Sequence, residues 1–280
     1  MSYNFLKLRI EDRVGWIEYN RPPINSFNWE MLREVPVALD DLLKDSQVRV
    51  VVFASANKKY FSTGADLKVF DGIGTKGMTE WVSICHGLVS KMRQSPKPLL
   101  AAIRGVAAGG GLEMVMHFDI RFASSDARLG QPEINIGFIP PVGTTQALAR
   151  LIGRPRAIRY LYEGTLVSAE EALVMGLVDL IYPPECLHAE VQTYAASLAQ
   201  KPAKALAAIR HTINEGGAVS FEEGLKLEYD AAVKLSGSTC HLWAQAAISI
   251  SFAAAPTSLS GSNRILMDSL PAVISIHPIV

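Results

Sequence analysis

The sequence predicts a mixed α/β fold that ends in a helical C-terminal region. Three observations support this prediction. Residues 5–54 read as strand, strand, helix and strand, and the order of strand then helix returns around a glycine triplet at residues 109–111. From residue 142 onward the pattern is mostly helical. A length of 280 residues allows one domain with a helical appendage, so we expect a core domain at residues 1–190 and a C-terminal region at residues 191–280.

The N-terminal unit begins with two short apolar runs. Residues 5–10 and 14–19 alternate or cluster apolar side chains around a polar turn, which is the pattern of a β-hairpin. Residues 28–44 place apolar side chains at helical intervals, with Pro36 as a point where the helix would kink. Residues 48–54 are β-branched and nearly all apolar, as expected of a strand that is covered on both faces.

The middle of the chain repeats this order. Three glycines between residues 72 and 77 predict a flexible span, and residues 78–93 predict a helix that a pair of prolines stops. Residues 99–104 predict a short apolar strand that leads into the glycine triplet, and residues 120–123 predict another strand.

The remainder is predicted to be mainly helical, and one helix carries a clear start signal. Ser168 followed by Glu171 is a capping box. The expected helices are residues 144–152, 155–163, 168–175, 185–200, 203–215 and 221–234, with a strand at residues 177–182.

The tail at residues 235–280 differs from everything before it. Only Arg264 and Asp268 are charged there, against 19% charged residues in the whole chain. An exposed tail of this composition would be poorly soluble. It must therefore pack on this chain or on a partner, or else arise from an artefact such as a frame change.

Composition excludes several classes of function. The net charge is +0, so no electrostatic argument favours nucleic acid or an anionic membrane as a partner. Cys85, Cys186 and Cys240 are far apart and have no CxxC spacing, which argues against disulfides and a zinc site. No apolar run approaches membrane-spanning length. We expect a cytoplasmic protein with no membrane, nucleic acid or metal partner.

The stretch GVAAGGGLEM at residues 105–114 joins the glycine triplet to an acidic side chain. Glycines at a helix N-terminus leave unpaired N–H groups that suit an oxygen gaining negative charge. Glu113 lies three residues after Gly110, so its side chain rises from nearly the same face. The alternative is a buried helix whose Glu113 caps its own first turn.

Two further stretches carry polar groups. In FSTGADLK, at residues 61–68, Ala65 offers a second N–H donor, and Asp66 is a candidate helix cap; an ordinary turn is the alternative. In GQPEINIGFIP, at residues 130–140, Glu133 lies within a hydrophobic run. Burial would raise its pKa and make it a usable proton donor near neutral pH. The alternative is a Glu133 satisfied by a salt bridge or by loop N–H groups.

Together these motifs resemble the enoyl-CoA hydratase/isomerase (crotonase) superfamily over residues 6–234, and most closely the enoyl-CoA hydratases. The resemblance implies a crotonase (ClpP-like) fold of repeated ββα units in a spiral, with a C-terminal helical region that forms homotrimers, often paired into hexamers. The motifs that carry it, in order, are NRPPIN at residues 20–25, FSTGADLK at 61–68, GVAAGGGLEM at 105–114, LGQPEINIGFIP at 129–140 and SAEEALVMGLVD at 168–179.

The resemblance also implies a function. The substrate would be an acyl-CoA thioester, with no separate cofactor. The amides of Ala65 and Gly110 would form the oxyanion hole, Glu113 would take a proton from a water attacking the β-carbon, and Glu133 would protonate the α-carbon. Alternatives on the same scaffold are a double-bond isomerase, a thioester hydrolase, a decarboxylase or a non-catalytic binding protein.

Further contacts to the substrate and its CoA group follow from the same motifs. Related hydratases read IPGxGGTQ where this chain has IPPVGTTQ at residues 139–146, and Pro141 and Thr144 leave the acyl-chain preference and the reaction in doubt. His117 is expected to be a packed core histidine. The residues expected to contact substrate are Arg21, Gly64, Asp66, Leu67, Lys68, Gly109, Pro140 and Gly143.

Overall fold

The computed structural model of the protein describes residues 3–249. The chain divides into two compact units, Met1–Leu235 and Ser236–Val280, and the candidate site lies in the first. The expected boundary at residue 190 falls inside helix α7 (Leu187–Ala199), which packs against the main sheet. A role for the C-terminal region in trimers stays a prediction. From residue 250 onward, the weakly charged tail lies outside the described residues.

The main sheet contains all six strands expected from sequence. They are β1 (Leu6–Glu11), β2 (Val14–Tyr19), β3 (Val50–Ser55), β5 (Leu99–Ile103), β7 (Ile120–Ser124) and β10 (Leu180–Tyr182). Their spatial order is β1-β2-β3-β5-β7-β10. β1 and β2 form the predicted antiparallel hairpin, and the remaining neighbours pair in parallel.

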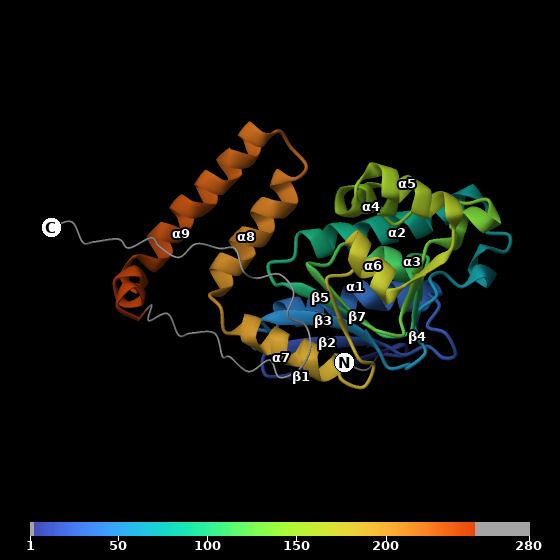
Figure 1. Ribbon diagram of the computed structural model, residues 1–280, viewed down its shortest axis with the longest axis horizontal. Coiled ribbons are helices and arrows are strands. Elements are labelled where there is room, and N and C mark those ends of the chain that lie inside the picture. Colours follow the sequence, from blue (N-terminus) through green and yellow to red (C-terminus); the bar gives the residue numbers. More distant parts are fainter. Residues whose placement is uncertain (1–2, 250–280) are drawn as a thin grey trace. The chain divides into compact units, whose positions relative to one another are not determined.

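Helices cover both faces of this sheet (Figure 1). Along β3 the side chains alternate: Val52 packs with α7 on one face, whereas Phe53 packs with α1 (Trp29–Lys44) and α2 (Gly74–Arg93) on the other. A strand that is buried on both faces needs apolar residues at every position. This explains why residues 48–54 show no polar alternation.

A second, smaller sheet brings the three motif loops to one edge. Its strands are β4 (Tyr60–Ser62), β6 (Val106–Ala108), β8 (Arg128–Gly130) and β9 (Leu166–Ser168), in that order. β4, β6 and β8 run parallel, so their carboxyl ends lie at the same edge. β4, β6, β8 and β9 were not predicted: each has only three residues, and unlike β10 none lies within a longer, largely apolar run.

The remaining helices agree with the sequence prediction except at some ends. The capping box of Ser168 and Glu171 is confirmed at the start of α6. α2 begins at Gly74, so part of the span predicted to be flexible is helical. α9 continues well beyond residue 234. The helices are α3 (Gly110–Val115), α4 (Thr144–Ile152), α5 (Arg154–Glu163), α6 (Ala169–Met175), α8 (Ala203–Gly216) and α9 (Phe221–Ser249).

A buried arginine joins α8 to the core. Arg210 pairs with Asp119 at 2.8 Å and donates to the carbonyl oxygens of Met92, Arg93 and Ser95. These bonds satisfy a guanidinium group that would be costly to bury alone. Among residues 3–249, no helix is long and apolar enough to cross a membrane.

Candidate active site

A cavity of about 250 Å³ lies at the edge where the three motif loops meet. Both predicted carboxylates line it, together with Ala65, Gly109 and Gly110. Leu67, at the start of the 3-10 helix η1 (Leu67–Phe70), also lines it. The sequence therefore identified a set of residues that the fold brings together from three separate loops.

The two predicted donor amides lie close to each other. Gly64 has φ +82°, and a Cβ built on it would lie 2.6 Å from the nitrogen of Gly110. A Cβ built on Gly110 would lie 3.7 Å from the nitrogen of Ala65. Only a glycine at position 64 allows this approach. Within the described chain, no backbone or side-chain acceptor takes a hydrogen bond from the amide of Ala65 or Gly110.

Glu113 lines the cavity and is buried, with 1% of its surface exposed. Its Oε2 accepts hydrogen bonds from the Val142 N–H at 2.7 Å and from the Thr144 hydroxyl at 2.9 Å. The alternative in which this side chain caps its own first turn is therefore wrong. Burial, with a smaller contribution from the charge of Glu133, raises the pKa of Glu113 to about 8.

Glu133 lies on the 3-10 helix η2 (Pro132–Ile136) and is 9% exposed. The side-chain amide of Gln131, oriented to suit both groups, donates to its Oε2 at 3.0 Å. No cation pairs with Glu133 among residues 3–249, so the salt-bridge alternative is wrong. Burial raises the pKa of Glu133 to about 7. Gly109 is needed beside it, since a Cβ there would lie 2.9 Å from Glu133 Oε1.

Two histidines hold the loop that faces Glu113. His86 Nε2 lies 2.7 Å from the carbonyl oxygen of Pro141, and His117 Nε2 lies 2.9 Å from that of Val142. His117 is buried, as predicted, but it follows α3 rather than lying within it. Neither role was predictable from local sequence, because the partner of each histidine lies more than twenty residues away in the chain.

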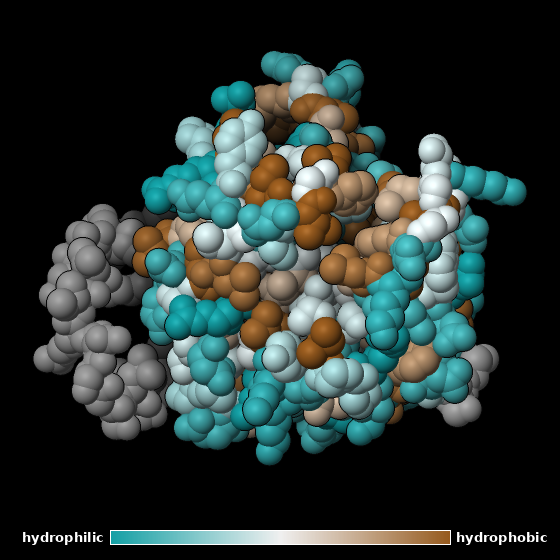
Figure 2. All heavy atoms as spheres, turned by 90° about the vertical axis from the view of Figure 1, so that its right-hand side faces the viewer, coloured by the Kyte–Doolittle hydropathy of each residue, from teal (hydrophilic) through white to brown (hydrophobic). Residues whose placement is uncertain are grey.

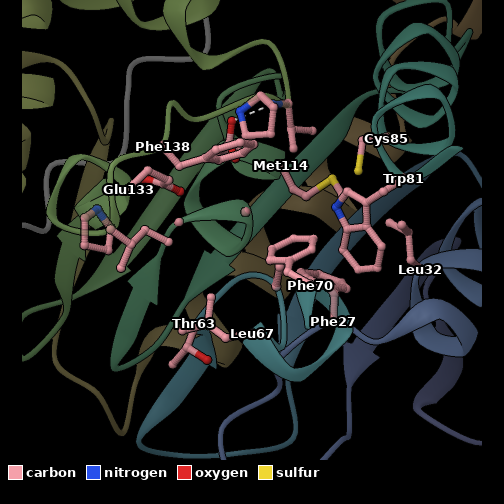
Figure 3. Close-up of a pocket in the computed structure, with 18 of the residues that line it drawn as sticks. Phe27, Leu32, Thr63, Leu67, Phe70, Trp81, Cys85, Met114, Glu133 and Phe138 are labelled. Atoms are coloured by element: carbon pink, nitrogen blue, oxygen red, sulfur yellow. Dashed lines mark hydrogen bonds between the residues drawn. The ribbon is translucent and has the colours of Figure 1, made fainter. Parts of the chain in front are cut away.

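The end of the cavity away from Glu133 is lined by buried, largely apolar side chains. Figure 3 shows Trp81, Cys85 and Leu32 on the side away from Glu133. Trp81 contacts Trp29 and Phe70 edge-on, with ring centroids 5.0 and 5.4 Å apart. The residues of this end, all missed by the sequence analysis, are Phe27, Leu32, Phe70, Trp81, Cys85 and Met114.

Several predicted contact residues do not line the cavity. Arg21 forms a 2.9 Å ion pair with Asp66 and also donates to Ser26. Lys68 is exposed and is held near the mouth by η1. Pro140 and Gly143 lie behind the lining, where Gly143 begins α4 against the ring of His117.

Exposed apolar side chains lie beside the cavity. Leu67 is 60% exposed and Ile136 is 58% exposed, although both line the cavity. Figure 2 shows apolar side chains interspersed with polar ones on the face at the right of Figure 1. No group of three or more His, Cys, Asp or Glu in the described part of the chain could hold a metal ion.

Comparisons with known proteins agree with this geometry. The profile of the enoyl-CoA hydratase/isomerase family matches residues 9–239. A probable enoyl-CoA hydratase of Bacillus subtilis is 34% identical over 80% of this chain and 88% of its own length. A crotonyl-CoA hydratase of Syntrophomonas wolfei is 31% identical over 82% of this chain and 89% of its own. The crystal structure of an enoyl-CoA hydratase from Bacillus anthracis superposes with a TM-score of 0.83 at 31% identity, covering 88% of this chain and 96% of that one.

Proposed function

The chain belongs to the enoyl-CoA hydratase/isomerase family and has the crotonase fold, and from this premise we propose that it is an enoyl-CoA hydratase. It adds water across the 2,3 double bond of a 2-enoyl-CoA to give a 3-hydroxyacyl-CoA. The observation that carries the proposal is the pair of buried carboxyl groups, Glu113 and Glu133, in one cavity beside the amides of Ala65 and Gly110. The chemistry needs only proton transfer and charge stabilisation, so the proposal includes no cofactor.

In the proposed reaction the two carboxyl groups start in opposite protonation states. Ionised Glu113 takes a proton from water while the water oxygen bonds to the β-carbon, and protonated Glu133 gives its proton to the α-carbon. The proton then returns from Glu113 to Glu133 before the next turnover. The raised pKa of each group supports a part in proton transfer, because a carboxyl that titrates near neutral pH can act as acid or as base. The assignment of base to Glu113 and acid to Glu133 follows the family resemblance and not the order of the two pKa values.

The two amides would stabilise the charge that this addition creates. Attack at the β-carbon moves electrons toward the thioester, and enolate charge builds on the carbonyl oxygen. Fixed N–H donors aimed at such an oxygen typically lower the activation free energy by several kcal/mol. The proximity of Ala65 and Gly110, and the absence of other acceptors for their N–H groups in residues 3–249, support this role.

We also propose that the acyl chain is short. The apolar end is closed by Leu32, Trp81 and Cys85, which are almost fully buried. A cavity of about 250 Å³ lies below the usual range for ligand pockets. One relative is a crotonyl-CoA hydratase. The exposed apolar side chains at the mouth, with Lys68 nearby, suit the long arm and phosphates of CoA.

The test is the absorbance of a conjugated enoyl thioester. Crotonyl-CoA should lose its absorbance with the enzyme, and the product should have the mass of the substrate plus one water. If crotonyl-CoA and longer 2-enoyl-CoAs stay unchanged while a 3-enoyl-CoA shifts its double bond, the protein is an isomerase and the proposal is wrong.

Substitutions of the two acids test their roles. Glu113→Gln and Glu133→Gln should each slow hydration by at least about a hundredfold, because each removes one proton-transfer group. Glu163→Gln is the matched control, since Glu163 is exposed on α5 and pairs only with Arg159 in the described structure. Normal turnover in either test variant would remove that residue from the mechanism.

We further propose a cytoplasmic homotrimer, or a dimer of trimers. Ile213, Phe221 and Tyr229 expose large apolar side chains on α8 and α9, where a partner subunit would cover them. Cys85 and Cys186 are both free thiols, as is usual in a reducing compartment.

A further inference from the structure

Thr144 occupies an unusual place beside the buried carboxyl of Glu113. Its side chain is fully buried, and its hydroxyl donates to Glu113 Oε2 at 2.9 Å. The same oxygen accepts the Val142 N–H at 2.7 Å. The backbone N–H of Thr144 also helps to stabilise the ionised carboxyl group. Oε2 is therefore held by two donors from the loop that leads into α4.

The backbone explains how Thr144 reaches this position. Gly143, with φ +83°, turns the chain so that α4 begins at Thr144, and Glu113 faces the N-terminus of that helix. The positive end of a helix dipole favours a carboxylate there. The preceding carbonyl oxygens, of Pro141 and Val142, are held by His86 and His117. These two histidines, on α2 and in the segment after α3, hold the loop before Thr144 in place. The hydroxyl of Thr144 is thereby kept next to the carboxyl group of Glu113.

We propose that Thr144 is a positioning residue whose hydroxyl holds one oxygen of Glu113, so that the other oxygen faces the reacting water. This inference rests on the proposed function, in which Glu113 takes a proton from the attacking water. It concerns Thr144, one of the two positions at which this chain departs from the IPGxGGTQ pattern. The threonine compensates there for part of the cost of burying the carboxylate.

The groups around Glu113 have opposing effects on its pKa. Burial and the charge of Glu133, on η2, raise its pKa, whereas the bonds from Val142 and Thr144 lower it. Cys85, on α2, is a neutral thiol because burial beside Glu113 raises its pKa. His86 and His117 act only through the carbonyl oxygens that they hold. Removal of the hydroxyl should therefore raise the pKa of Glu113 by about one unit.

The experiment compares Thr144→Val, Thr144→Ser and the control Thr145→Val in the full chain. Thr145 is exposed, and its hydroxyl contacts only the side chain of Gln146 in the described structure. For each variant, kcat/KM for crotonyl-CoA is measured against pH. A second readout, which needs no turnover, is the pH dependence of the free energy of unfolding.

The acid limb of the kcat/KM profile should move up by about one pH unit in Thr144→Val, which is about a tenfold loss at a fixed acidic pH. Thr144→Ser should restore the profile, and Thr145→Val should leave it unchanged. If Thr144→Val does not fold, Thr144→Ala replaces it. An unshifted profile, or a failure of serine to restore it, overturns the inference. If the wild-type protein hydrates no enoyl-CoA, the proposed function fails instead, and the unfolding curves still decide whether Thr144 sets the pKa of Glu113.

Discussion

At the scale of single residues, the site depends on two carboxyl groups that share a mostly apolar cavity. Glu113 and Glu133 are both almost fully buried, and each has a raised pKa. Two like charges in one small cavity repel each other, so near neutral pH one group tends to keep its proton. The same burial that prepares them for proton transfer reduces stability whenever both are ionised.

The pH dependence of stability should reveal this cost. A folded-state pKa of about 8 for Glu113 and about 7 for Glu133 exceeds the ordinary value, so the folded state holds these protons more tightly. The contribution of these two groups to stability is then greatest below a pH of about 4.3 and falls as the pH rises through the two raised values. Between about pH 5.5 and about pH 8.5, wild type should lose on the order of 2 kcal/mol more than Glu113→Gln. Urea unfolding at both pH values measures this difference, and parallel curves would contradict it.

A second prediction concerns the residue that limits chain length. Leu32→Ala should deepen the apolar end and raise turnover of octenoyl-CoA relative to crotonyl-CoA by about tenfold. Leu39→Ala is the matched control: Leu39 is buried on the same helix but does not line the cavity. Both variants should lose about 2–5 kcal/mol of stability. An equal chain-length profile in the two variants would show that Leu32 does not set the limit.

At the scale of elements, the small sheet matters more than its size suggests. β4, β6 and β8 are three residues each, yet their parallel pairing sends the three motif loops out of one edge. The loop after β4 then lies against the loop after β6. Gly64 is the point of contact, because its missing side chain leaves room for the Gly110 amide.

Gly64→Ala should therefore separate the two loops. Position 64 has a positive φ, and the added methyl would lie 2.6 Å from a backbone nitrogen that cannot rotate away. We expect kcat to fall by about a hundredfold, because the two amides would no longer point at the same carbonyl oxygen. Gly87→Ala on α2 is the control, since nothing lies within 4 Å of its added carbon in the described structure. Equal rates in both variants would argue against an oxyanion hole at this contact.

At the scale of the whole molecule, α8 and the start of α9 present apolar side chains to solvent. Ile213 is 68% exposed and Phe221 is 76% exposed. Arg210 joins α8 to the core through four partners. An exposed apolar surface of this kind is typical of contacts between subunits.

Light scattering should report a mass of three or six times 30.4 kDa. Ile213→Asp should shift the protein toward the monomer, because a charge at a buried contact stays unpaired. Val174→Asp is the control: Val174 is 83% exposed, but it lies on α6, away from this surface. A monomeric wild type, or the same mass for both variants, would exclude assembly through α8.

The sequence by itself determined the local features of this protein. The hairpin, the strand buried on both faces, the capping box at Ser168 and the residues Ala65, Gly110, Glu113 and Glu133 were all readable. Each depends on neighbours within a few positions, where spacing and side-chain type decide the outcome.

Only the tertiary structure decided how these features meet. β4, β6 and β8 of the small sheet were not predicted, although their parallel pairing aligns the motif loops. The hydrogen bonds from Val142 and Thr144 to Glu113 join residues about thirty positions apart. The contact between His86 and the carbonyl oxygen of Pro141 joins residues that are 55 positions apart. Such contacts leave no periodic pattern in the chain, since they follow from how strands and loops pack and not from local spacing.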